Sequence, residues 1–143
     1  PNNIYGIRQH PEKLIAGFFW CIVKNKKFTL HGNGNQKRTY LYVEDFCKSV
    51  DLVFRKGKKD EIYNVGTEEE FKNLELIKLM CQISGINLRD YIKKIPDRLF
   101  NDSRYSIDLS KIKKLGWKSE NNLKKILPKI FNWTKMNHNN FSR

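Results

Sequence analysis

Apolar residues recur along this chain at helical spacing, and short β-capable runs lie between these stretches. From Pro11 to about Lys24 apolar residues fall every three or four positions, which predicts an amphipathic helix with a wide apolar face. Further helices are expected over residues 44–57, 74–84, 110–114 and about 123–133. Strands are expected to end at Gly6 and to cover residues 28–31, 38–43, 61–65, 91–95 and 104–107. This alternation predicts an α/β fold.

Several residues are expected to begin, end or bend these elements. The run 32–35, Gly-Asn-Gly-Asn, accepts positive φ and predicts a hairpin between the strands that flank it. Asn73 is expected to cap the helix that follows it, and Gly85 to end that helix. Pro128 lies inside the last helical pattern, so this helix either kinks there or begins near Leu127.

Length and charge limit the classes of protein to consider. A chain of 143 residues predicts one domain, or one half of something larger. The net charge of +13 favours an anionic partner such as nucleic acid, an acidic membrane surface or a phosphorylated small molecule. The lysines, however, occur in small groups along the whole chain, so a solvated basic surface is favoured over a nucleic-acid-binding arm.

The cysteines and the apolar runs predict a cytoplasmic protein with no membrane partner. Cys21, Cys47 and Cys81 have no ligand spacing and fall in apolar patterns, so buried thiols in a reducing compartment are expected. The longest apolar run, 14–23, is about half of what a membrane span of roughly 20 residues needs. No signal peptide or anchor is visible.

The first fourteen residues form a strand-loop-helix joint. The polar loop 8–10 separates Gly6 from Pro11, which has the character of a residue that opens a helix. Because such a joint places loop residues beside the amide groups of a helix start, it favours an anionic ligand. A purely structural turn explains the same pattern about equally well.

Three polar side chains are candidates for ligand binding. The guanidinium of Arg38 can take two oxygens of a diphosphate, although a surface arginine explains its position too. Arg98 lies in a loop rich in polar residues that either contacts a ligand or holds itself with ion pairs. Asn64 is expected at the end of a short buried strand, where its amide needs partners in the protein or in a ligand.

No catalytic constellation is visible. The histidines, His10, His31 and His138, have no metal-ligand spacing. No serine-centred nucleophile elbow, P-loop or complete glycine-rich cofactor fingerprint is present. The residues alone therefore predict a domain that binds an anion, without the machinery for turnover.

Several separated segments resemble the second half of the nucleotide-sugar 4,6-dehydratases, which belong to the extended short-chain dehydrogenase/reductase superfamily. The first, residues 2–15, combines Asn-Asn-Ile-Tyr-Gly with Pro-Glu-Lys-Leu-Ile. The others are residues 31–34, 38, 41–45, 62–67, 97–98, 102–105 and 115–117. Pro-Glu-Lys-Leu favours a dTDP- or UDP-glucose dehydratase over an epimerase or a decarboxylase, which remain alternatives.

The resemblance implies a role for each matching residue. Arg38 and Arg98 would hold the substrate diphosphate together with Asn3, and the backbone of Ile4 would lie near the nicotinamide of NAD. The remaining implied substrate-binding residues are Lys13, Leu14, Thr29, Leu30, His31, Asn64 and Asn101.

The resemblance also implies the fold and the reaction. Residues 1–143 would be a carboxyl-terminal portion: the substrate-binding lobe with the last strands and a helix of an NAD-binding Rossmann domain, whose amino-terminal part would be absent. The intact enzyme, expected to be a homodimer, would convert NDP-glucose to NDP-4-keto-6-deoxyglucose in deoxysugar (rhamnose-type) biosynthesis, and this chain alone would be inactive. Two alternatives stay open, a catalytically inactive sugar-nucleotide module and a non-enzymatic basic nucleic-acid-binding domain.

Overall fold

The computed structural model describes residues 1 and 3–140, so Asn2, which begins the first matching segment, lies outside the described residues. Five strands and six helices are described. The strands are β1 (Asn3–Tyr5), β2 (Phe28–His31), β3 (Lys37–Tyr42), β4 (Glu70–Lys72) and β5 (Ile92–Ile95). The helices are α1 (Leu14–Val23), α2 (Val43–Lys56), α3 (Asn73–Ser84), α4 (Leu88–Tyr91), α5 (Ser110–Lys114) and α6 (Leu123–Asn137), with a 3-10 turn at His138–Asn140. The expected α/β class is confirmed.

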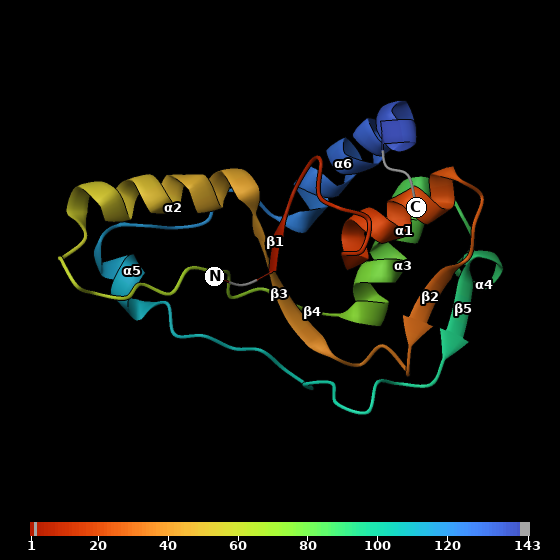
Figure 1. Ribbon diagram of the computed structural model, residues 1–143, viewed down its shortest axis with the longest axis horizontal. Coiled ribbons are helices and arrows are strands. Elements are labelled where there is room, and N and C mark those ends of the chain that lie inside the picture. The colour runs from red at the N-terminus through yellow and green to blue at the C-terminus, as the bar shows by residue number, and fades with distance from the viewer. Residues whose placement is uncertain (2, 141–143) are drawn as a thin grey trace.

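The strands form two small sheets (Figure 1). In the larger sheet the order is β1-β3-β4, with β3 parallel to β1 and antiparallel to β4. The smaller sheet pairs β2 with β5 in parallel. In Figure 1 helices α1, α3 and α6 gather on the side of the molecule that carries the smaller sheet, and α2 extends away from them.

The expected hairpin between β2 and β3 is wrong, because these strands lie in different sheets. The glycines do turn the chain, since Gly32 has φ +60° and Gly34 has φ +71°. A Cβ on Gly34 would lie 3.0 Å from the Cβ of Leu74, so the turn packs tightly against the start of α3. Strand β2 pairs with β5, and β3 pairs with β1 and β4. The local chemistry of a turn does not determine these strand partners.

Two expected strands are not formed. Residues 61–65 and 104–107 are extended without strand pairing, apart from a single bridge between Lys37 and Arg104. Strand β3 pairs with β1 over residues 40–42 and with β4 over residues 37–39, and the bridge to Arg104 is confined to Lys37 at its beginning. A strand that was not expected, β4, lies directly before α3.

The expected helices are confirmed, although α1, α2 and α3 begin at other residues than expected. Helix α1 begins at Leu14, because residues 10–13 form a turn in which the Lys13 N–H donates to the His10 carbonyl at 3.1 Å. Asn73 is the first residue of α3 and does not cap it. The Glu75 carboxylate accepts there from the Lys72 N–H at 3.0 Å.

The last helix does not begin at Leu127. Helix α6 starts at Leu123, where the Asn122 side chain accepts from the Lys125 N–H at 3.0 Å, and it continues through Pro128. Gly85 ends α3 with φ +67° and Gly116 follows α5 with φ +94°, as expected.

Aromatic and aliphatic side chains of α1, α3 and α6 form the main core. Phe18, Phe19, Leu76 and Leu127 are fully buried in it. A second cluster around Leu41, Ile112 and Trp117 lies between β3, α5 and the loop after α5. None of the described helices combines the length and the apolar character that crossing a bilayer requires.

The prediction of three buried thiols holds for two of them. Cys21 and Cys81 are buried, whereas Cys47 is exposed. Cys47 shares helix α2 with Val50 and Phe54, which are 51% and 89% exposed. The described residues therefore bury only part of the apolar surface of α2 and leave Cys47, Val50 and Phe54 exposed.

Asp45 connects α2 to the loop before α6. This carboxylate is 1% exposed and lies in the first turn of α2. Its Oδ2 accepts from Ser119 Oγ at 2.8 Å and from the N–H groups of Glu120 and Asn121 at 3.2 and 2.9 Å, and its Oδ1 accepts from Asn121 Nδ2 at 2.8 Å. One buried side chain thus satisfies four donors on a loop more than 70 positions away in the sequence.

Replacing Asp45 by alanine is expected to lower the free energy of unfolding by about 2 kcal/mol, because four donors, most of them half-buried, would lose a charged acceptor. Urea unfolding measures this change. The control is Asp51→Ala on the same helix, where an exposed ion pair with Arg55 is lost at a cost of about 0.5 kcal/mol or less. Equal shifts for the two variants would contradict the connecting role of Asp45.

Candidate functional site

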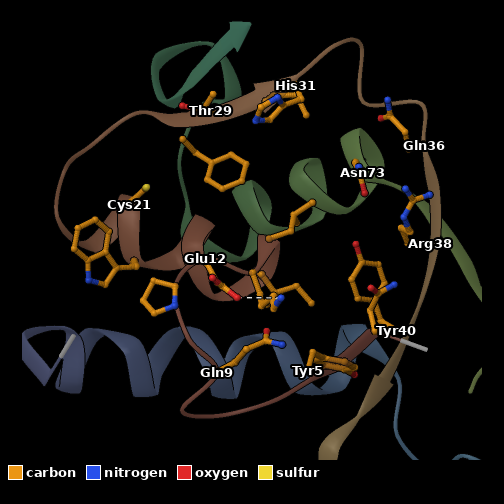
Figure 2. A pocket seen from close by; sticks show the side chains of 18 of the residues that line it. Tyr5, Gln9, Glu12, Cys21, Thr29, His31, Gln36, Arg38, Tyr40 and Asn73 are labelled. Carbon is orange, nitrogen blue, oxygen red and sulfur yellow. Dashed lines mark ion pairs between the residues drawn. The ribbon is translucent and has the colours of Figure 1, made fainter. Parts of the chain in front are cut away.

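A cavity of about 970 Å³ opens between β1, the loop before α1, β2, the beginning of β3 and the loop after β5. Figure 2 shows side chains from these separate elements facing a common space. Loops and strand ends that are far apart in the sequence therefore form one site. The wall contains both cationic and aromatic side chains.

The structure brings together all of the predicted site residues except Asn64. The cavity is lined by Asn3, Ile4, Lys13, Leu14, Thr29, Leu30, His31, Arg38, Arg98 and Asn101. These residues come from five segments of the chain, so the convergence expected of Asn3, Arg38 and Arg98 is present. What each residue binds is a separate question.

Asn64 does not belong to this site. It is exposed, lies in an extended segment outside any strand and is not among the cavity-lining residues. The expectation of an amide at the end of a buried strand is wrong, because residues 61–65 find no strand partner among the described residues.

Arg38 is held in place by neutral groups. Its Nη1 donates to the Lys37 carbonyl at 2.8 Å, and its Nη2 donates to the Asp102 carbonyl at 2.8 Å and to Asn101 Oδ1 at 3.3 Å. The guanidinium also lies over the ring of Tyr105, 4.5 Å from its centre. No described carboxylate pairs with it, so its position is restrained while its charge stays available to an anion.

Asp97 organises the loop that carries Arg98. Its Oδ1 accepts from Asn101 Nδ2 at 2.9 Å and from the Arg98 N–H at 2.8 Å, and its Oδ2 accepts from Gln36 Nε2 at 2.6 Å. These donors, first the Asn101 side chain and then the Arg98 backbone, hold the pKa of Asp97 below its usual range. All three are neutral, and within the described chain nothing pairs with the guanidinium of Arg98.

Polar side chains of β1 and of the loop before α1 line the cavity, and contacts within the chain restrain them. Asn3 Nδ2 donates to the Thr39 carbonyl at 3.1 Å, which holds this side chain beside β3. Gln9 Nε2 donates to the Ile4 carbonyl at 2.6 Å. Lys13 is exposed and pairs with its neighbour Glu12 at 3.0 Å.

Gln36, Tyr40 and Asn73 are among the cavity-lining residues that sequence reasoning missed. The two-residue alternation of a strand could have predicted Tyr40. Arg38 and Tyr40 lie on one face of β3, while Thr39 and Leu41 are buried on the other. Burial raises the pKa of Tyr40 to about 12, and nearby Arg38 opposes this shift. Gln36 and Asn73 join the site through tertiary contacts that no local pattern indicates.

Within residues 1 and 3–140, neither a metal site nor a glycine-rich phosphate loop accompanies this cavity. The part of the chain that the structure describes contains no cluster of three or more His, Cys, Asp or Glu side chains that could hold a metal ion. The turn at Gly32 and Gly34 leads into a strand, whereas a dinucleotide-binding loop opens a helix. The arrangement can bind an anion that also carries an aromatic or polar portion.

The family model described as GDP-mannose 4,6 dehydratase matches residues 2–130. The dTDP-D-glucose 4,6-dehydratase of Dictyostelium discoideum is 36% identical, with 96% of this chain and 39% of that protein covered. A trifunctional enzyme of Arabidopsis thaliana, whose name begins with UDP-glucose 4,6-dehydratase, is 37% identical, with 95% of this chain and 20% of that protein covered.

A solved structure shares the fold over nearly the whole chain. The dTDP-glucose 4,6-dehydratase of Streptomyces venezuelae, solved with NAD and TDP bound, has a TM-score of 0.93 at 31% identity. The match covers 99% of this chain and 44% of that one, in its carboxyl-terminal portion. The expected extended short-chain dehydrogenase/reductase fold is confirmed, and the chain spans less than half the length of these relatives.

The buried phenol of Tyr40 is expected to make stability depend on alkaline pH. Its pKa is near 12 in the folded chain and about 10 when unfolded. The neutral phenol therefore contributes its full stabilisation below pH 10, and this stabilisation is lost as pH rises toward 12. Tyr40→Phe should reduce the fall in the free energy of unfolding between pH 10 and 12 by about 2 to 3 kcal/mol. Urea unfolding at pH 8, 10.5 and 11.5 measures this. An unchanged pH dependence would contradict the assignment, whatever the stability at pH 8.

Proposed function

This chain belongs to the GDP-mannose 4,6 dehydratase family, and on that basis we propose that it binds the nucleotide sugar in a dTDP- or UDP-glucose 4,6-dehydratase. The observation that carries the proposal is the convergence of Arg38, Arg98 and Asn3 on one cavity. Both arginines present their charge without a carboxylate partner among the described residues. A diphosphate has the charge and the spread of oxygens to engage two guanidinium groups at once.

The remaining wall fits the rest of a nucleotide sugar. The strand that carries Thr29, Leu30 and His31 offers an apolar and polar surface for the base, and Leu14 lies against the same cavity. Lys13 is exposed at the end of the first loop, where its ammonium pairs with Glu12. Asn3 keeps its Oδ1 available after its Nδ2 has donated to Thr39.

NAD is the cofactor of the proposed enzyme, in which it would accept a hydride from C4 of the sugar and return it to C6 after water is lost across C5 and C6. Of the residues described, Ile4 is the one we assign near the nicotinamide. Its carbonyl accepts from Gln9, which restrains the backbone at the edge of the cavity. Since the described residues provide no phosphate loop for a dinucleotide, this portion contributes mainly the positioning of the sugar nucleotide.

Replacing Arg38 by glutamine in the natural chain that contains these residues should weaken the binding of dTDP and of UDP by about 10- to 100-fold. The physical reason is the loss of a charge-assisted contact worth about 1.5 to 3 kcal/mol. Isothermal titration calorimetry measures the affinities. The matched control is Arg55→Gln on α2, where the same change removes only an exposed ion pair with Asp51.

Two results would contradict the proposal. One is that neither nucleoside diphosphate binds the unaltered chain. The other is that Arg38→Gln and Arg55→Gln bind both equally well. A single-stranded oligonucleotide that binds with a steep salt dependence in place of the nucleotides would favour the nucleic-acid alternative.

A further inference from the structure

Gln36 presents an unsatisfied acceptor on the wall of the cavity. The side chain is 8% exposed and lies directly before β3. Its Nε2 donates to Asp97 Oδ2 at 2.6 Å, while its Oε1 is buried and has no hydrogen-bond partner among residues 1 and 3–140. A buried acceptor left in this state costs about 1 to 3 kcal/mol, so a ligand that supplies a donor gains by filling it.

The orientation of this amide is determined by its partner. A carboxylate only accepts hydrogen bonds, so the nitrogen of Gln36 must face Asp97 and the oxygen must face away from it. Exchanging the two atoms would place oxygen against oxygen. The free acceptor is therefore a consequence of the Asp97 contact.

The position of Gln36 indicates which part of a nucleotide it would meet. Figure 2 shows Gln36 on the wall between His31 and Arg38, with Asn73 beside it. The Asn73 N–H donates to the Gln36 carbonyl at 3.1 Å, and Asn73 Oδ1 is another buried acceptor that no described residue satisfies. This stretch of the wall accordingly offers acceptors, whereas Arg38 next to it offers donors.

We propose that Gln36 Oε1 accepts a hydrogen bond from a sugar hydroxyl of the bound nucleoside. This inference rests on the proposed function, because it takes the base to lie against β2 and the diphosphate against Arg38. The group between base and diphosphate is the ribose or deoxyribose, whose hydroxyls are neutral donors. Through its Nε2, Gln36 then connects the bound sugar ring to Asp97 and so to the loop that carries Arg98.

A thermodynamic cycle between the protein and the ligand tests this contact. The ligands are dTDP and 2′,3′-dideoxythymidine diphosphate, which differ by the 3′-hydroxyl, and UDP and 2′,3′-dideoxyuridine diphosphate, which differ by both the 2′- and the 3′-hydroxyl. In the unaltered natural chain, loss of the hydroxyls should weaken binding by about 10-fold. In Gln36→Leu the same loss should change the affinity by less than about 2-fold, because the acceptor is already gone.

Gln82→Leu provides the matched control, since it makes the same change at an exposed position on α3 and should keep the full 10-fold effect. Urea unfolding shows whether Gln36→Leu is folded. If it is not, Gln36→Met repeats the cycle with a side chain of similar length and flexibility. A merely structural role of Gln36 would weaken both members of each ligand pair alike and leave the hydroxyl effect intact.

The outcomes separate this inference from the proposed function. If the unaltered chain binds the nucleotides with and without hydroxyls equally well, the hydroxyl contact is overturned and the nucleotide site stands. A 10-fold hydroxyl effect that persists in Gln36→Leu also overturns it. If the unaltered chain binds none of the four nucleotides, both the contact and the proposed function are overturned.

Discussion

Arg38 and Arg98 keep their positive charge at the cavity because no described carboxylate pairs with either guanidinium, and neutral groups hold that of Arg38 in place. Arg38 donates to carbonyl and amide oxygens, and Asp97 accepts from two side-chain amides and a backbone N–H rather than from the guanidinium of Arg98. A direct ion pair between Asp97 and Arg98 would neutralise the guanidinium, and an incoming anion would then have to displace the carboxylate before it could bind. Orientation without neutralisation is what an anion site needs before its ligand arrives.

The position of β3 makes this arrangement possible. The strand is paired on both edges, by β1 and β4, and it starts beside the loop that follows β5. The Lys37 N–H donates to the Ser103 carbonyl at 2.8 Å, and Arg104 pairs with Glu70 of β4 at 2.6 Å. The loop with the second arginine is thereby fastened to the sheet that presents the first.

The chain matches a portion of relatives that are much longer. In the proposed function, this portion contributes mainly the positioning of the sugar nucleotide. The described residues would bind and orient it through charged and polar groups on a small scaffold of sheets and helices. Helix α2 is attached to that scaffold through Asp45 and the loop at residues 119–121. Its remaining apolar residues, among them Phe54, stay exposed within the described chain.

Sequence by itself determined the local features of this protein: the helices, the turn at Gly32 and Gly34, and the types of side chain at positions 38 and 98 that suit a diphosphate. These follow from periodicity, backbone freedom and charge, which act over a few residues. Its likeness to a known family also predicted which residues would share one site, with Asn64 as the exception. Only the tertiary structure decided strand partners, and so it overturned the expected hairpin and the strand at 61–65. It also decided that the donors around Asp97 are neutral and that Gln36 has a buried acceptor without a described partner, because hydrogen bonds between residues some 60 positions apart exist only after the chain has folded.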